Sequence, residues 1–228
     1  PGRQEALEYY QGIARQKKLH LNLYEIVLKV SKDQSIFNIE TSKGKYQARN
    51  VIISTGFYDI PNLMNIPGEK LDKVKHYYTE PYPYAQQKIV VVGSSNSAVD
   101  AALETYRKGA EVTMIIRHAE ISKSVKYWVK PDIENRIKEG SITAHFNSEM
   151  LEIKENSVLF KDENGATREI ENDFVLAMTG YLPDFDFLRN SGINLQGDCL
   201  NPYYNEETME SNVPNLYLAG VVCGGKDT

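Results

Sequence analysis

The feature that most constrains the fold of this chain is an internal repeat. Residues 19–56 read LHLNLYEIVLKVSKDQSIFNIETSKGKYQARNVIISTG, and residues 142–180 read ITAHFNSEMLEIKENSVLFKDENGATREIENDFVLAMTG. Each copy contains a first strand, a charged turn, an alternating strand and a Gly-containing turn, and it ends in an apolar run that enters Thr-Gly. A pattern repeated over this length predicts two domains of one architecture.

Each copy predicts a small antiparallel sheet followed by one buried strand. Apolar and polar residues alternate over 35–40 and 157–161, with turns at Gly44 and Gly165, which predicts a three-stranded antiparallel meander. The apolar runs that end the copies, at 51–56 and 175–180, are typical of buried strands in a parallel sheet.

Only the second copy is preceded by a complete βαβ pattern. An apolar strand at 88–92 leads into a helix at 96–108, Gly109 provides a C-cap, and a second strand follows at 111–117. Gly93 and Gly180 are 87 residues apart, so the equivalent glycine turn of the first copy would precede residue 1. We therefore expect an N-terminally truncated chain, in which a helix at 2–17 precedes the first meander.

The turn after the first strand of the βαβ unit has the pattern of a dinucleotide site. In KIVVVGSSNSAVDAALE (88–104) the three small-residue positions are Gly93, Ser95 and Ala98. Such residues allow a tight bend, close approach of the backbone to a pyrophosphate and close packing of helix on strand, while the helix N-terminus holds the anion. Asn96 or Ser97 is expected to cap the helix. The alternative is a structural turn that binds no ligand.

The end of the second strand favours NADP over NAD. An NAD site has an acidic residue about 20 residues after the turn, where it accepts from the ribose 2′-hydroxyl. Here the strand ends in Arg117 and His118, followed by Lys123 and Lys126, while Glu120 lies beyond the strand end. Cationic groups attract a 2′-phosphate. The alternative is an ordinary solvated strand end and loop.

Composition excludes several classes of function. The chain has 228 residues, 41% hydrophobic and 25% charged, which is enough to bury a core. Its net charge of −5, without a basic block, argues against nucleic acid as the main partner. No run approaches the roughly 18 apolar residues of a membrane span. Two cysteines, Cys199 and Cys223, make no disulfide framework, so we expect a cytoplasmic protein. The four histidines have no metal-binding spacing, so we expect no metal site.

Motifs spread along the whole chain resemble those of flavoprotein reductases. VIISTG, the Ile60-Pro61 and Pro67-Gly68 pairs, the VVGSSNSAVDAAL turn, VLAMTGYLPD and NLYLAG occur in that order, as in the thioredoxin-reductase-like group. HYYTEPYPY (76–84) and SVKYWVKPDIENRIKEG (124–140) resemble more closely the bacillithiol disulfide reductase (YpdA-type) family.

This resemblance implies an α/β protein with two Rossmann-like dinucleotide-binding domains, each with a three-stranded meander and the first one incomplete. The expected domains are a partial FAD-binding domain at 1–75 and 181–228, and an inserted NADPH-binding domain at 76–180. The implied function is NADPH- and FAD-dependent reduction of a low-molecular-weight thiol disulfide, in the service of thiol redox balance. The implied partners are a small-molecule disulfide and further copies of the chain, in a dimer or tetramer.

The resemblance also implies roles for individual residues. Gly93, Ser95, Asn96, Ser97 and Ala98 are expected at the NADPH pyrophosphate, and Arg117, His118 and Lys123 at its 2′-phosphate. The two Thr-Gly turns and the Ala-Gly that follows the last strand complete the set of cofactor-binding residues: Thr55, Gly56, Gly180 and Gly220.

The chain departs from the resembled enzymes at three places. The stretch YTEPYPYAQQ (78–87) has no Cys-x-x-Cys, so thioredoxin reductase chemistry is not expected. Val221 stands where an Asp usually contacts the flavin. The reactive cysteine of the resembled family lies near an N-terminal glycine turn outside this sequence, so no catalytic residue is assigned. Cys223 is interpreted as a small buried hydrophobe rather than a catalytic thiol.

Two alternative functions stay open from the sequence. A flavin monooxygenase-like enzyme shares the glycine turn and the Thr-Gly strands, and it would consume oxygen. A non-catalytic NADP-binding fragment would bind nucleotide without turnover.

Overall fold

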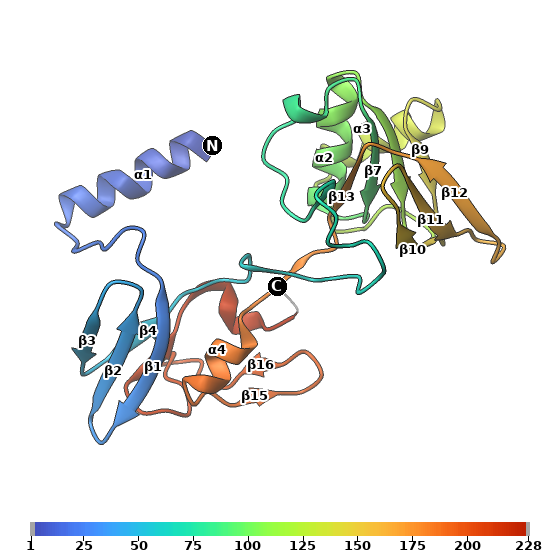
Figure 1. Ribbon diagram of the computed structural model, residues 1–228. Helices are drawn as coiled ribbons and strands as arrows, with labels where there is room; N and C mark the ends of the chain where they lie inside the picture. The colour runs from blue at the N-terminus through green and yellow to red at the C-terminus, as the bar shows by residue number, and fades with distance from the viewer. Residues whose placement is uncertain (1–2, 227–228) are drawn as a thin grey trace. The chain divides into compact units, whose positions relative to one another are not determined.

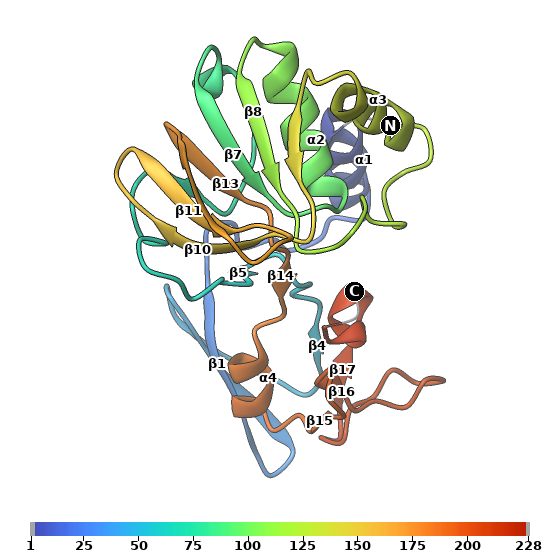
Figure 2. The ribbon, with the colours of Figure 1, turned by 90° about the vertical axis from the view of Figure 1, so that its right-hand side faces the viewer.

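The computed structural model describes residues 3–226, which form two compact units (Figures 1 and 2). Unit 1 comprises the residues up to Gly56 and those from Asp184 onward, and unit 2 runs from Phe57 to Pro183. Unit 2 is thus inserted into the sequence of unit 1.

The bounds of the two units differ from the predicted domain bounds of 1–75 with 181–228 and 76–180. The segment 57–75 belongs to unit 2, because β6 (Val74–Lys75) pairs in parallel with β13 (Phe174–Ala177). The Ile153 N–H also donates to the Pro67 carbonyl at 2.9 Å. The observed boundary therefore lies about twenty residues before the predicted one. The sequence does not show it, because the short strand pair has no strong hydrophobic pattern.

Unit 2 is built on a five-stranded parallel sheet with the order β6-β13-β7-β8-β9. The predicted strand at 88–92 is confirmed as β7 (Lys88–Val92), and the predicted strand at 111–117 is shorter, as β8 (Glu111–Ile115). The helix between them, α2 (Asn96–Arg107), completes the predicted βαβ unit, and β9 (Thr143–His145) lies beyond β8.

Both faces of this sheet are covered. Ile89 and Val91 of β7 pack in one core cluster with α2 and with α3 (Lys130–Lys138). Val90 packs in a second cluster with the buried Phe160 of the meander. The continuous apolar run of β7 therefore has a physical cause, because each of its two faces meets a hydrophobic layer.

The two predicted meanders are confirmed as separate three-stranded antiparallel sheets. In unit 2, Val158 and Phe160 are fully buried and Leu159 between them is half-buried, as period-two alternation requires. Their strands are β1 (Val27–Asp33), β2 (Ile36–Thr41) and β3 (Lys45–Ala48) in unit 1, and β10 (Glu149–Ile153), β11 (Ser157–Lys161) and β12 (Thr167–Glu171) in unit 2.

Unit 1 contains a pair of parallel strands, β4 (Val51–Ile53) and β17 (Leu216–Leu218). The apolar segment 215–222 therefore returns to the first unit, as expected. The prediction that 51–56 forms a buried strand holds only in part, since Ile53 is buried but Ile52 is 67% exposed.

The remaining elements are short apart from α1, which confirms the helix expected at 2–17. Those of unit 1 are α1 (Arg3–Gln16), α4 (Phe185–Asn190), β15 (Leu195–Gln196), β16 (Asn201–Pro202) and the 3-10 helix η2 (Gly220–Gly224). Those of unit 2 are β5 (Ile60–Pro61), the 3-10 helix η1 (Tyr82–Tyr84) and β14 (Tyr181–Leu182).

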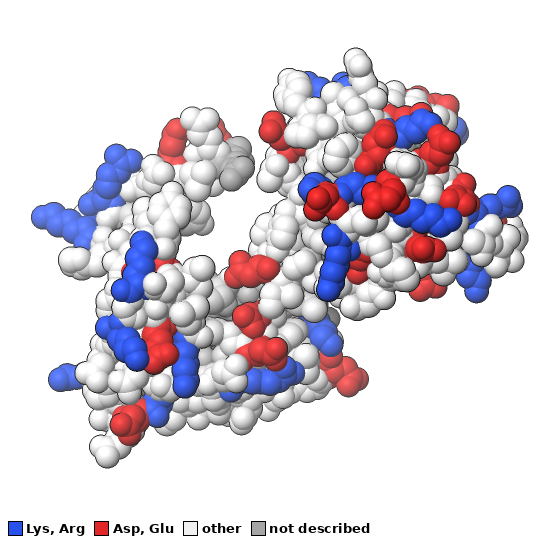
Figure 3. Space-filling view, viewed as in Figure 1, with Lys and Arg blue, Asp and Glu red and all other residues white. Residues whose placement is uncertain are grey.

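The surface carries charges of both signs. On the face that Figure 3 shows, basic and acidic side chains are interspersed over each unit. Among residues 3–226, no helix has the length and apolar character needed to cross a membrane. In that same part of the chain, no three His, Cys, Asp or Glu side chains are grouped as metal ligands.

Candidate functional site

The turn between β7 and α2 requires glycine at its first position. Gly93 has a φ of +126°, and its N–H donates to the Ile115 carbonyl at 3.2 Å. A Cβ atom there would lie 2.5 Å from the Met178 carbonyl oxygen and 3.3 Å from the Ala98 Cβ. Because Gly93 and Ala98 are both small, the start of α2 lies directly against the ends of β7 and β13.

The start of α2 is arranged to receive an anion. Ser95 is the N-cap residue, with extended backbone and an exposed side chain that makes no capping hydrogen bond. The prediction of Asn96 or Ser97 as the cap is therefore wrong, because α2 begins at Asn96 and the residue before it is the cap. The first N–H groups of a helix have no intrahelical acceptor and carry the positive end of its dipole. At the start of this twelve-residue helix the Ser95 and Ser97 side chains are exposed.

A loop from a later part of the chain lies on this turn. The 121–126 loop is held by a hydrogen bond from the Ser122 N–H to the Ser94 carbonyl at 3.1 Å. The Asn96 side-chain amide bonds the same loop twice: Nδ2 donates to the Ser124 carbonyl, and Oδ1 accepts from the Lys126 N–H, each at 3.0 Å. These contacts span 28 and 30 residues. Sequence reasoning missed them, since no local pattern marks where a loop returns.

The predicted cations lie at the same edge of the sheet as the glycine turn. Arg117 and His118 follow β8, which is parallel to β7, so the carboxyl ends of both strands share one edge. Both side chains are exposed, and Arg117 Nε donates to His118 Nε2 at 3.2 Å. Lys123 is exposed and makes no ion pair with any residue in 3–226, whereas Lys126 Nζ lies 3.4 Å from Asp100 Oδ2.

These features fit a phosphate-bearing dinucleotide. Three features lie along one edge of the sheet: a turn at Gly93 that has no room for a Cβ, the first N–H groups of α2, and cationic side chains. The chemistry of the donors therefore suits a pyrophosphate at the helix and a further phosphate at the cations.

The residues predicted to contact flavin lie together in unit 1. Thr55 and Gly56 follow β4, Gly220 follows β17, and the Ala219 N–H donates to the Ile53 carbonyl at 3.0 Å. Gly56 and Gly220 have φ values of +72° and +79°, and a Cβ on Gly56 would lie 3.7 Å from Val221 Cγ2. Two parallel strands thus end side by side in turns that favour glycine.

Gly180 belongs to unit 2, whereas the residues predicted to contact flavin belong to unit 1. It has a φ of +93°, and its carbonyl accepts from the Asn62 N–H at 3.0 Å. No atom lies within 4 Å of a Cβ built on it, so open space adjoins this turn.

The two cysteines lie in short elements of unit 1. Cys223 is half-buried within η2, and burial raises the pKa of its thiol. A raised thiol pKa lowers the fraction of thiolate, which is the nucleophilic form. Cys199 lies between β15 and β16 and forms no disulfide with Cys223. The environment of Cys223 therefore does not activate its thiol.

We therefore expect Cys223→Ser to retain the activity that the sequence resemblance implies within about twofold of wild type, since a thiol with a raised pKa contributes little thiolate. The measurement is disulfide-dependent NADPH oxidation by the full-length protein, with Cys199→Ser as the parallel variant. Loss of turnover with the flavin still bound would contradict the interpretation of Cys223 as a structural residue.

The tyrosine-rich segment packs within unit 2. Tyr77 stacks on Tyr181 with ring centroids 5.2 Å apart, and Tyr58 lies 4.2 Å from the same ring. The Tyr78 hydroxyl donates to Glu104 of α2 at 2.7 Å, and Tyr84 is buried. Tyr77, Tyr78 and Tyr84 thus attach the segment 77–84 to the rest of unit 2.

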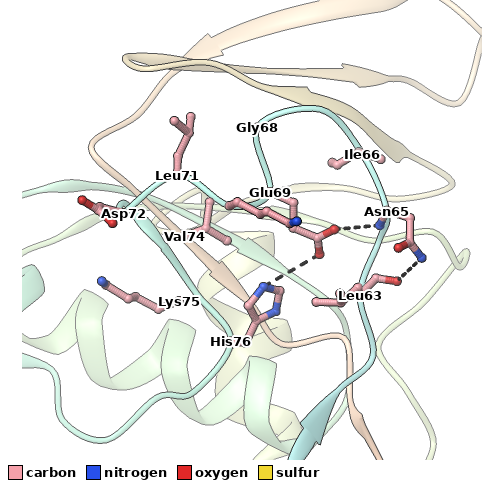
Figure 4. Close-up of a pocket in the computed structure, with 11 residues that line it drawn as sticks. Leu63, Asn65, Ile66, Gly68, Glu69, Leu71, Asp72, Val74, Lys75 and His76 are labelled. Atoms are coloured by element: carbon pink, nitrogen blue, oxygen red, sulfur yellow. Dashed lines mark hydrogen bonds and ion pairs between the residues drawn. The ribbon is translucent and has the colours of Figure 1, made fainter.

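Unit 2 also contains a cavity of about 790 Å³ lined entirely from within residues 63–76 (Figure 4). In it the nearly buried Glu69 carboxylate accepts from the Met64 and Asn65 N–H groups at 2.8 and 2.7 Å. His76 Nε2 lies 3.8 Å from Glu69 Oε1, and His76 Nδ1 has no hydrogen-bond partner among the described residues. None of the lining residues belongs to the glycine turn or the 121–126 loop, so the cavity is separate from the candidate nucleotide site.

Comparison with known proteins gives close relatives over the whole chain. The chain is 44% identical over 228 residues to the bacilliredoxin reductase Bdr of Bacillus subtilis (strain 168), covering 100% of this chain and 70% of that protein. It superposes on the bacillithiol disulfide reductase Bdr (YpdA) of Bacillus cereus with a TM-score of 0.96 at 42% identity, covering 99% of this chain and 71% of that one. The corresponding enzyme of Staphylococcus aureus gives a TM-score of 0.96 at 39% identity, over 100% of this chain and 71% of that one.

These matches confirm the predicted resemblance and the predicted fold class. The pyridine nucleotide-disulphide oxidoreductase family model matches residues 1–220. The chain therefore belongs to the pyridine nucleotide-disulphide oxidoreductase family, whose members are enzymes.

Proposed function

We propose that the intact enzyme transfers two electrons from NADPH, by way of FAD, to the disulfide of a low-molecular-weight thiol of the bacillithiol disulfide type. In the balanced reaction, NADPH, one proton and one disulfide give NADP⁺ and two thiols. The observation that carries this proposal is the similarity over the full chain to bacilliredoxin and bacillithiol disulfide reductases.

The family assignment supports the predicted cofactors, FAD and NADPH. When bound, they supply hydride and electron transfer, while the protein supplies binding and orientation. We assign the pyrophosphate of NADPH to the turn at Gly93, where Ser95, Ser97 and Ala98 open α2. We assign the 2′-phosphate to the surroundings of Arg117, His118 and Lys123.

The remaining proposed cofactor contacts come from glycine turns. Thr55, Gly56 and Gly220 would contact the flavin nucleotide in unit 1, where two parallel strands end together. Gly180 forms a turn in unit 2 where a Cβ would meet open space. That space would leave room for the nucleotide.

The proposed setting is the cytoplasm, and the proposed assembly is a homo-oligomer. Two cysteines that form no disulfide suit a reducing compartment. A small-molecule disulfide as substrate is consistent with the same relatives.

The proposal is tested by following NADPH oxidation by the full-length protein with bacillithiol disulfide as the substrate. We expect turnover that depends on the disulfide. Oxygen consumption coupled to oxidation of a soft nucleophile, without disulfide dependence, would instead indicate the monooxygenase-like alternative. Nucleotide binding without either activity in the flavin-loaded protein would indicate the non-catalytic alternative.

Arg117→Ala tests the nucleotide preference. A charge-assisted hydrogen bond contributes roughly 1.5–3 kcal/mol, so we expect the Kd for NADPH to rise about 10- to 100-fold while the Kd for NADH stays nearly constant. Isothermal titration calorimetry measures both constants. Arg168→Ala is the matched control, because that exposed side chain lies in β12 and pairs with Asp162. Equal affinity of the wild type for NADPH and NADH would overturn the 2′-phosphate assignment.

A further inference from the structure

The resemblance places Asn96 among the pyrophosphate contacts, but its side chain is already engaged. Nδ2 donates to the Ser124 carbonyl and Oδ1 accepts from the Lys126 N–H, each at 3.0 Å. A side-chain amide has an acceptor oxygen and two N–H donors, and the oxygen and one N–H are used here by backbone groups of the 121–126 loop. Asn96 is thus oriented toward a loop of its own chain.

The 121–126 loop is otherwise attached only near its ends. Ile121 and Val125 are 3% and 4% exposed and pack into the cluster that contains Ala98 and Val99 of α2. The Ser122 N–H reaches the Ser94 carbonyl at 3.1 Å. Lys123 and Ser124 lie between these contacts and are exposed. The Asn96 amide binds the backbone at Ser124 and Lys126, on the C-terminal side of Lys123.

The consequence concerns the cations that the loop carries. Lys123 is exposed and makes no ion pair with any residue in 3–226, so its ammonium group is available to an anion, and the backbone of the loop sets where its side chain starts. A flexible side chain loses entropy when it binds a phosphate, and a fixed backbone reduces that cost. Asn96 therefore links the start of α2, where the pyrophosphate would lie, to the loop that would meet the 2′-phosphate.

We propose that Asn96 is a positioning residue for NADP specificity: it acts through the 121–126 loop and Lys123, and not by contact with the nucleotide. This inference rests on the proposed NADPH site. It differs from the role that the resemblance implies, and the two roles predict different results with two nucleotides. A pyrophosphate contact serves NADPH and NADH alike, whereas a loop that positions Lys123 serves only the nucleotide with the 2′-phosphate.

The experiment measures the Kd of NADPH and of NADH for the full-length protein by calorimetry. For Asn96→Ala we expect the NADPH Kd to rise about 5- to 30-fold, in line with the partial loss of a charge-assisted contact, and the NADH Kd to stay within twofold. Ser97→Ala is the contrast variant on the same helical turn, and it is expected to affect both nucleotides equally. Equal weakening of both nucleotides by Asn96→Ala, or no change in either, would overturn the proposal.

A double-mutant cycle isolates the coupling. If Asn96 acts through Lys123, the double variant Asn96→Ala/Lys123→Ala binds NADPH as tightly as whichever single variant has the lower NADPH affinity. Additive losses would contradict the mechanism. Hydrogen exchange provides a readout without nucleotide: the Lys126 N–H should lose protection in Asn96→Ala, while the Val99 N–H, which donates to the Ser95 carbonyl, keeps it. A wild type that binds NADPH no better than NADH would instead refute the proposed NADP site itself.

Discussion

Gly93→Ala is expected to abolish measurable NADPH binding and to destabilise unit 2. The φ of +126° is strained for any residue with a side chain, and the new Cβ would lie 2.5 Å from the backbone oxygen of Met178. Backbone strain and overpacking each cost about 1–3 kcal/mol, so we expect the free energy of unfolding to fall by about 2–6 kcal/mol.

The loss of binding has its own physical cause. Relief of the contact with Met178 would move the turn away from the end of β13, and the start of α2 would move with it. The N–H groups that would face the pyrophosphate depend on that position. We expect the NADPH Kd to rise by at least about 100-fold, which corresponds to roughly 2.7 kcal/mol.

The control for Gly93→Ala lies at the other end of the same helix. Gly109 has a φ of +86°, and its Cβ would meet only the flexible Gln86 side chain at 3.8 Å. Gly109→Ala should cost about 1–2 kcal/mol from its left-handed conformation and leave the NADPH Kd unchanged. Urea denaturation and calorimetry measure the two quantities. A Gly93→Ala protein that binds NADPH within threefold of wild type would contradict the glycine-turn assignment.

Gly68→Ala is expected to be the most destabilising single methyl addition in unit 2. Its Cβ would lie 1.7 Å from the Ile153 carbonyl oxygen, which is a backbone atom at the end of β10. The neighbouring Pro67 carbonyl accepts from the Ile153 N–H at 2.9 Å. Relief of the overlap must therefore separate this segment from β10 and break that hydrogen bond.

The cost has several parts. We expect a loss of at least about 3 kcal/mol, from strain, overpacking and one hydrogen bond. Gly140→Ala is a matched control, because Gly140 has a φ of +81° against +80° for Gly68 and a Cβ on it meets no atom within 4 Å. Its expected cost is the left-handed strain alone, about 1–2 kcal/mol. Equal unfolding free energies for the two variants by urea denaturation would show that the approach of Gly68 to β10 is not tight.

Local patterns predicted those elements whose signal lies within a few residues. The sequence predicts both ends of β7 correctly, because its apolar run is continuous and Gly93 follows it directly. The meanders were predicted because alternation of period two and Gly-containing turns specify hairpins without distant contacts. The helix cap was misplaced by one residue, since Ser95, Asn96 and Ser97 are all suitable caps and only the backbone conformation distinguishes them.

The boundary between the units could not be read from such patterns. β6 has two residues, and its place in the sheet comes from pairing with β13, about one hundred residues later. Pairing at this separation depends on how the residues between the two strands fold. A strand of two residues has no periodicity that could predict it.

The sequence by itself determined the repeat, the βαβ unit, the glycine at position 93 and the cations that follow β8, because composition and spacing over short distances carry those features. The tertiary structure decided which unit holds residues 57–75, which carbonyl makes Gly93 irreplaceable, and what the Asn96 side chain binds. The last two depend on backbone atoms of Met178, Ser124 and Lys126. Every residue carries the same N–H and C=O groups, so only the path of the folded chain determines which of them meet.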